Sequence, residues 1–238
     1  MSQKDVKITE YKIIEKESVT HNTNRFRFDI PDNIEFKYLP GDFIKVYPDP
    51  GNPLEYRPYT PTSTPEIEGY FELIVKHYSD GFVSKYMKEK GIGDTVSISG
   101  PHEGGHFSEG MAKKISMVAG GTGITPMISI IRWILSHGYD IQIQLLFANK
   151  AVEDIILKDE FDRYAEKHDN FKRYYVLEKA PDGWDMGVGY ITRELLNEKL
   201  FPPADDSLVF LCGPPMMQLN LKKYIVEMGY TADKIIFP

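Results

Sequence analysis

The pattern of apolar and polar positions changes character near residue 108. Before that point, short runs of alternating or β-branched residues are separated by glycine, proline, asparagine and aspartate, which is typical of β-strands joined by turns. The runs fall at 25–30, 42–47, 69–78 and 94–100, with one helical segment at about 83–90. Short strands at this spacing predict a small antiparallel barrel or sandwich.

After residue 108, continuous apolar runs alternate with segments of helical period. We expect strands at 114–120, 141–148, 171–178, 207–213 and 234–237, and helices at about 124–137, 152–167, 192–199 and 215–228. This alternation predicts a parallel sheet with helices on both faces. The chain is therefore expected to form two domains, an antiparallel β-barrel over 1–108 and an α/β nucleotide-binding domain over 109–238.

Composition narrows the class of protein. A chain of 238 residues with 42% hydrophobic and 26% charged residues has globular values. The net charge of −7 argues against nucleic-acid binding, which needs clustered lysine and arginine. One cysteine excludes an intrachain disulfide and a cysteine-rich metal cluster.

No membrane span or secretion signal is expected either. The first residues are polar, and glycines, Pro126 and Arg132 interrupt the most apolar stretch, 115–135. We therefore expect a cytoplasmic protein. We also expect it to act as a monomer.

The segment GPHEGGHF (100–107) contains the letters of a zinc-protease motif, H-E-x-x-H. That motif binds zinc only on a helix, where the two histidines share a face. Gly100-Pro101 before the motif and Gly104-Gly105 inside it oppose a helix. We expect a loop at the seam between the domains and no metal site.

Two glycine-containing turns follow strands in the second half. AGGTGITPM (119–127) and FLCGPPMM (210–217) each join an apolar strand to a helix. Such a turn binds an anion or lets a flat ring approach the backbone, although a tight turn without a ligand has the same pattern. Cys212 in the second turn is either a pocket residue or a buried structural thiol.

Other candidate positions also have two interpretations. Glu178, at the end of a strand, either accepts hydrogen bonds from a ribose or is a solvated surface residue. YRPYTPTS (56–63) offers Arg57 to a diphosphate and Tyr59 to an aromatic ring, or is an ordinary edge strand. Ser84 begins a helix, either as an anion site or as an N-cap.

Four motifs occur in an order that resembles one family. RPYTPTS (57–63), GFVS (81–84), GGTGITPM (120–127) and CGPPMM (212–217) follow each other as in the ferredoxin–NADP reductase superfamily. Within this superfamily, the chain most resembles the NADH–cytochrome b5 reductase branch. The segments LLFANK (145–150) and APDGWDMGVGYI (180–191) also resemble that branch. The resemblance covers nearly the whole chain.

The resemblance implies bound FAD and NADH and assigns a role to each matching residue. For FAD it implies Arg57 and Pro58 beside the diphosphate, Tyr59 on the isoalloxazine ring and Thr60 near flavin N5. It also implies Ile74 and Lys76 at the pyrimidine edge of the flavin and Thr125 against the flavin. Gly81, Val83 and Ser84 would form a helix start that binds the diphosphate. For NADH it implies Gly121, Thr122, Cys212, Gly213, Pro214 and Met217 around the nicotinamide, Glu178 at the ribose, and a contribution from Lys76. Thr60 and Cys212 then flank the redox centre.

The implied reaction is hydride transfer from NADH to FAD, followed by single-electron transfer to an external carrier. A cytochrome b5-like haem protein is the acceptor that the resemblance implies. A ferredoxin, a flavodoxin or an oxygenase is the alternative acceptor, and a nucleotide-binding scaffold without turnover is an alternative of another class. Four lysines, Lys85, Lys88, Lys113 and Lys114, form either an acceptor-docking patch or an ordinary solvated surface.

Overall fold

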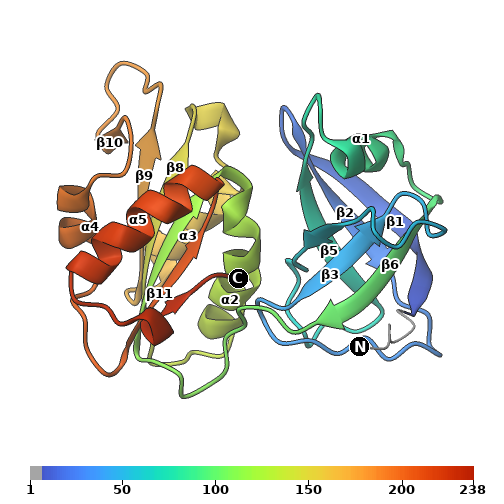
Figure 1. Ribbon diagram of the computed structural model, residues 1–238, viewed down its shortest axis with the longest axis horizontal. Helices are drawn as coiled ribbons and strands as arrows, with labels where there is room; N and C mark the ends of the chain where they lie inside the picture. The colour runs from blue at the N-terminus through green and yellow to red at the C-terminus, as the bar shows by residue number, and fades with distance from the viewer. Residues whose placement is uncertain (1–6) are drawn as a thin grey trace.

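The computed structural model describes residues 7–238, which form two six-stranded sheets side by side (Figure 1). The first contains β1 (Ile8–Thr20), β2 (Thr23–Asp29), β3 (Phe43–Tyr47), β4 (Arg57–Tyr59), β5 (Tyr70–Lys76) and β6 (Thr95–His102), with helix α1 (Phe82–Glu89) between β5 and β6. Its order is β4-β3-β6-β1-β2-β5, and each pairing is antiparallel. We call this half the flavin domain, after the cofactor that the sequence resemblance implies for it.

The flavin domain closes around one apolar core. Thr62 N donates to the carbonyl oxygen of Glu72 at 2.8 Å, which ties the segment after β4 to β5 at the other end of the sheet. Phe26, Phe28 and Phe71 are fully buried inside. The antiparallel barrel prediction is confirmed.

The second sheet is parallel throughout. It contains β7 (Lys114–Gly120), β8 (Gln142–Asn149), β9 (Phe171–Leu177), β10 (Gly187–Val188), β11 (Ser207–Cys212) and β12 (Ile235–Ile236), in the order β10-β9-β8-β7-β11-β12. Its helices are α2 (Thr125–Ser136), α3 (Lys158–Lys167), α4 (Arg193–Lys199) and α5 (Pro215–Glu227), with short turns η1 (Gly121–Ile124), η2 (Val152–Asp154) and η3 (Ala232–Lys234). We call this half the nucleotide domain, after the ligand that the sequence analysis predicts for it.

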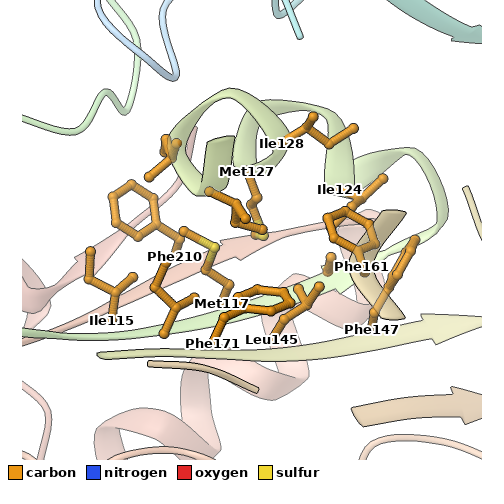
Figure 2. Packing of buried hydrophobic residues seen from close by; sticks show 14 of the residues in the cluster. Ile115, Met117, Ile124, Met127, Ile128, Leu145, Phe147, Phe161, Phe171 and Phe210 are labelled. Carbon is orange, nitrogen blue, oxygen red and sulfur yellow. The ribbon is translucent and has the colours of Figure 1, made fainter. Parts of the chain in front are cut away.

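Both faces of the parallel sheet are buried, which explains its continuous apolar runs. Met117 and Phe210 pack on one face, below Met127 and Ile128 of α2 (Figure 2). Val118, next to Met117, points to the opposite face, in the core with residues of α4 and α5. The parallel-sheet prediction is confirmed.

Some elements differ from the sequence pattern. The helix expected at 152–167 is broken, because Leu157 adopts a left-handed conformation (φ 57°) between η2 and α3. The pattern does not predict β1 or β10, whereas β4 lies at the edge of its sheet, in the segment for which an edge strand was one of two interpretations. In β1, the longest strand, only Tyr11 and Ile13 are buried, so its alternation is too short to recognise.

The two sheets meet along β5, α2 and the segment that joins β6 to β7. Ile74 of β5 and Phe107 of the connecting segment are both buried in the core of the nucleotide domain. The predicted boundary between residues 108 and 109 falls in this segment. Of the helices formed by residues 7–238, none has the length and apolarity needed to cross a bilayer.

Candidate active site at the seam between the two domains

A cavity of about 1110 Å³ opens between the domains. Its flavin-domain wall includes His21, Asn22 and the segment 76–80, and its other wall is formed by the carboxyl ends of β7, β8, β9 and β11. This is where a parallel sheet binds ligands, because the strand order reverses between β7 and β11. Of the residues predicted from the sequence, the cavity is lined by Lys76, Gly121, Thr122, Glu178, Gly213, Pro214 and Met217.

Glycine is required where the loop after β7 meets the loop after β11, and we call these two segments the crevice loops. A Cβ atom on Gly123 would overlap the backbone of Cys212, and one on Gly213 would lie 3.1 Å from the backbone nitrogen of Gly120. The loops after β7 and β11 therefore touch through their backbones. Gly121 has a φ of +53° and lines the cavity, so its glycine serves the backbone conformation.

Cys212 does not line this cavity. Burial raises the pKa of its thiol to about 11, and its Sγ lies 3.8 Å from the carbonyl oxygen of Pro238. The thiol is therefore protonated at neutral pH and is not an activated nucleophile. These features support the structural interpretation of the side chain, while its backbone helps to shape the crevice.

The RPYT segment presents an unpaired cation beside a partly buried phenol. The guanidinium of Arg57 donates to the adjacent carbonyl of Tyr56 at 2.9 Å and, among residues 7–238, forms no salt bridge. Burial raises the pKa of Tyr59 to about 12, although the nearby Arg57 acts to lower it. Thr60 is 8% exposed. The segment thus has a free positive charge next to an aromatic ring.

The free edge of β5 offers backbone donors and acceptors. The backbone N–H of Glu72 donates to Ser63 Oγ, and its carbonyl accepts from Thr62 N, so both groups point away from β2. Backbone direction alternates along an antiparallel strand, so the N–H and C=O of Ile74 point the same way. At that position β5 is the edge strand of the sheet. This edge suits a planar ring that carries both donors and acceptors.

Two predicted hydroxyl groups have partners within the protein. Ser84 Oγ accepts a hydrogen bond from Tyr78 N at 3.2 Å and donates to the Gly81 carbonyl at 3.3 Å. Thr125 Oγ1 donates to the Thr122 carbonyl at 3.0 Å. Both side chains stabilise turns. An anion at the start of α1 would be bound by the backbone N–H groups of its first turn, which have no intrahelical acceptor.

After the ends of β8 and β9, the cavity is lined by one basic and one acidic residue. Glu178 and Lys150 both line it, whereas the adjacent Lys179 does not. Lys179 donates its backbone N–H to the Lys150 carbonyl at 2.7 Å. The lysine that accompanies Glu178 in the cavity is therefore Lys150, which sequence adjacency did not reveal.

Asn149 is a further cavity residue that the sequence analysis missed. It is 7% exposed, lines the cavity, and neither its amide oxygen nor its amide nitrogen has a hydrogen-bond partner. An unpaired buried amide is costly, which indicates a ligand that both accepts and donates hydrogen bonds. Its position as a polar residue at the end of a buried strand, in LLFANK, was the available signal.

The two histidines of the HEGGH segment have separate partners. His102 Nε2 lies 3.0 Å from Ser99 Oγ, and His106 Nδ1 lies 3.2 Å from Asp42 Oδ1. Residues 103–107 are not helical, so the geometry of a zinc-protease motif is not formed. The segment is a loop at the seam, as predicted.

The glycines of this loop allow close packing. A Cβ on Gly104 would lie 2.8 Å from the Gly41 carbonyl oxygen, and one on Gly105 would lie 2.6 Å from Pro238 Cα. The loop therefore packs against the flavin domain on one side and against the end of the nucleotide domain on the other.

Both domains match known protein families, and the chain as a whole is similar to named relatives. Residues 10–108 match the family described as oxidoreductase FAD-binding domain, and residues 117–223 match oxidoreductase NAD-binding domain. The NADH-cytochrome b5 reductase 1 of Dictyostelium discoideum is 41% identical over 227 residues, covering 94% of this chain and 79% of that protein. The Kluyveromyces lactis protein of the same name is 39% identical, with coverages of 97% and 83%.

The chain belongs to the NADH–cytochrome b5 reductase family.

The solved structures agree with this assignment. The cytochrome b5 reductase domain of Ulva prolifera nitrate reductase superposes with a TM-score of 0.90 at 28% identity, covering 98% of this chain and 97% of that one. This reductase is therefore an oxidoreductase whose cofactors are FAD and NADH, as its two matched domains indicate.

The residues present fit both cofactors. Arg57, which has no carboxylate partner among residues 7–238, and the edge of β5 at Ile74, where no further strand pairs, are what a diphosphate-linked flavin requires. The glycine crevice and the unpartnered amide of Asn149 are what a second nucleotide requires. The individual residue roles stay predictions.

Proposed function

We propose that this reductase transfers electrons from NADH, through FAD, to cytochrome b5. The observation that carries the proposal is a cavity lined by both domains, with the nucleotide crevice on one wall and Lys76, at the end of β5, on the other. The names of the relatives supply the acceptor. Bound FAD would supply the redox chemistry, as an acceptor of a hydride from NADH and a donor of single electrons.

The chain's own residues bind and orient the cofactors. Arg57 supplies positive charge for the FAD diphosphate, Tyr59 supplies a ring face, and the Thr60 hydroxyl supplies a hydrogen bond near flavin N5. Glu178 accepts from ribose hydroxyls and repels a 2′-phosphate. Catalysis in this scheme consists mainly of positioning the two cofactors, and no protein nucleophile takes part.

The acceptor would approach beside α1. Phe82 is 57% exposed, and Lys85 and Lys88 are exposed on the same helix, which follows directly after cavity residues 78–80. Lys113 and Lys114 lie at the amino end of β7. The length of the seven-residue strand β7, roughly 20 Å, separates them from the crevice. This separation favours the α1 pair, Lys85 and Lys88, as the acceptor-docking residues.

The direct test is NADH oxidation by the purified, FAD-loaded protein with cytochrome b5 or ferricyanide as acceptor. The proposal expects both to be reduced, and charge reversal of Lys85 and Lys88 to slow only the cytochrome. Ferricyanide reduction without cytochrome b5 reduction would show that the acceptor is wrong. A colourless protein that does not take up FAD would contradict the proposal as a whole.

A further inference from the structure

The outer face of β5 carries charges of opposite sign at its two ends. Glu72, Ile74 and Lys76 follow each other at every second position, so their side chains share one face of the strand. Phe71, Leu73 and Val75 point the other way, into the barrel core. Ile74 is 2% exposed and belongs to the nucleotide-domain core, so this outer face is in contact with the other domain.

At one end of the strand, Arg132 of α2 crosses the seam. Its Nη1 donates to the carbonyl oxygen of Thr62 at 2.7 Å and lies 3.6 Å from a carboxylate oxygen of Glu72. Its Nε and Nη2 bind both carboxylate oxygens of Glu160 in α3, at 2.7 and 2.9 Å. All three nitrogens are used, which fixes the fork of the guanidinium.

At the other end, the polarity is reversed. Lys76 Nζ lies 2.8 Å from Asp154 Oδ1 in η2, and the side chains are only 13% and 12% exposed. Lys76 and Asp154 both line the cavity. The Lys76 ammonium, which forms a hydrogen bond across the seam, keeps the pKa of Asp154 below its usual value although burial opposes this. Asp154 is therefore charged at neutral pH.

Opposite polarity at two points selects one register. Glu72 and Lys76 are four strand residues apart, or roughly 13 Å. A nucleotide domain turned end for end on β5 would bring Glu72 to Asp154 and Lys76 to Arg132, and a shift along the strand would separate both pairs. Either arrangement parts the partly buried Lys76 and Asp154, which is strongly unfavourable, and breaks the hydrogen bond from Arg132 to the Thr62 carbonyl. Glu72 keeps Arg27 at 2.9 Å and Arg132 keeps Glu160, so the Lys76–Asp154 pair carries most of the selection.

β5 therefore belongs to the flavin domain and also contacts the nucleotide domain. Its free backbone edge at Ile74 is the predicted flavin contact, and its side chains hold the nucleotide domain. We propose that Arg132 and Asp154 are positioning residues that clamp the nucleotide domain to β5 in one register, so that the strand beside the flavin also fixes where the nicotinamide arrives. The clamp is independent of the proposed function, and only its kinetic consequence rests on it.

Hydrogen–deuterium exchange of the FAD-loaded protein tests the clamp. Asp154→Asn removes one charge at the seam. Asp162→Asn is the matched control, because Asp162 pairs with Lys158 and Arg173 entirely within the nucleotide domain. We expect flavin-domain peptides that cover β5 to exchange about tenfold faster in Asp154→Asn. The control should change exchange only around α3 and β9.

Two further variants separate charge from shape. Asp154→Glu keeps the charge and is expected to restore slow exchange of β5. Arg132→Lys keeps the charge but loses the planar fork, so it should speed exchange of β5 as Asp154→Asn does. Exchange of β5 within about twofold of wild type in both Asp154→Asn and Arg132→Lys would overturn the proposal. Equal acceleration by Asp162→Asn would overturn it too.

The kinetic arm measures the consequence. At saturating NADH, Asp154→Asn should slow flavin reduction about tenfold with unchanged FAD content and visible spectrum, because a small displacement of the reacting groups has a large cost. Asp162→Asn should match wild type. Wild-type reduction rates in Asp154→Asn would refute the positioning role. A wild-type protein that NADH does not reduce would refute the proposed function and leave the exchange result to decide the clamp.

Discussion

The backbone of Gly123, in the first crevice loop, packs directly on the carbonyl group of Cys212 at the end of β11, with no room for a Cβ atom between them. The contact holds two loops that are about ninety residues apart at the point where the strand order reverses. It gives the glycine and the cysteine a shared structural role in the crevice.

Gly123→Ala is therefore expected to force the crevice loops apart. Overpacking of this kind costs about 1–3 kcal/mol of unfolding free energy, and the affinity for NADH should fall with it. Gly91→Ala is the matched control, since its Cβ would meet only Asp94 Oδ2 at 3.8 Å, an ordinary contact. Urea unfolding and NADH titration check both variants. Unchanged stability and NADH affinity in Gly123→Ala would contradict the packing argument.

Thr60→Val should slow flavin reduction about tenfold while FAD stays bound, because one hydrogen bond of about 1.4 kcal/mol is lost near N5. Thr62→Val is the control from the same segment. Thr62 is fully buried, and its hydroxyl donates to the Glu72 carbonyl at 3.4 Å. Stopped-flow absorbance with NADH measures the rate. Reduction of Thr60→Val at the wild-type rate would remove the residue from the redox centre.

Glu178→Gln should relax the preference for NADH. Removing the carboxylate leaves Lys150 as the charged residue of that pair in the cavity, so the ratio of kcat/KM for NADPH to that for NADH should rise about tenfold. Lys179→Gln is the control, because Lys179 lies outside the cavity lining. An unchanged ratio in Glu178→Gln would place the ribose elsewhere.

Cys212 is expected to react slowly with alkylating reagents. Burial raises its pKa from 9.0 to about 11, so at pH 8 its thiolate fraction is roughly a hundredfold below that of an unperturbed thiol, and the rate should keep rising up to about pH 11. Iodoacetamide labelling of the holoenzyme across pH, followed by mass spectrometry, gives the profile. A rate that levels off near pH 8 would show an activated thiolate.

Asn149→Leu should raise the unfolding free energy of the nucleotide-free protein by about 1 kcal/mol, because a buried amide without partners is removed. The KM for NADH should increase in the same variant. Asn170→Leu is expected to lower the unfolding free energy instead, since Asn170 Nδ2 donates to the Ile141 carbonyl at 2.9 Å. Thermal unfolding and steady-state kinetics measure the two effects. A destabilised Asn149→Leu would show that the amide has a structural partner.

Local patterns were sufficient for much of the fold. Continuous apolar runs such as 114–120 identify strands buried on both faces, and the turns after β7 and β11 identify the crevice, because these features depend on neighbouring residues in the chain. The break at Leu157 and the long strand β1 were missed. Leu157 gives no residue-type signal for a left-handed conformation, and β1 buries too few side chains to show its alternation.

The sequence by itself determined two domain types, the order of the motifs and the family resemblance, since these depend on residue type and spacing. Only the tertiary structure decided which charges meet. Arg132 stands in an apolar helix and Asp154 in a short turn, and nothing near either in the chain indicates that both reach β5. Such pairings depend on how the two sheets are placed in space, and that placement arises from contacts between residues far apart in the chain.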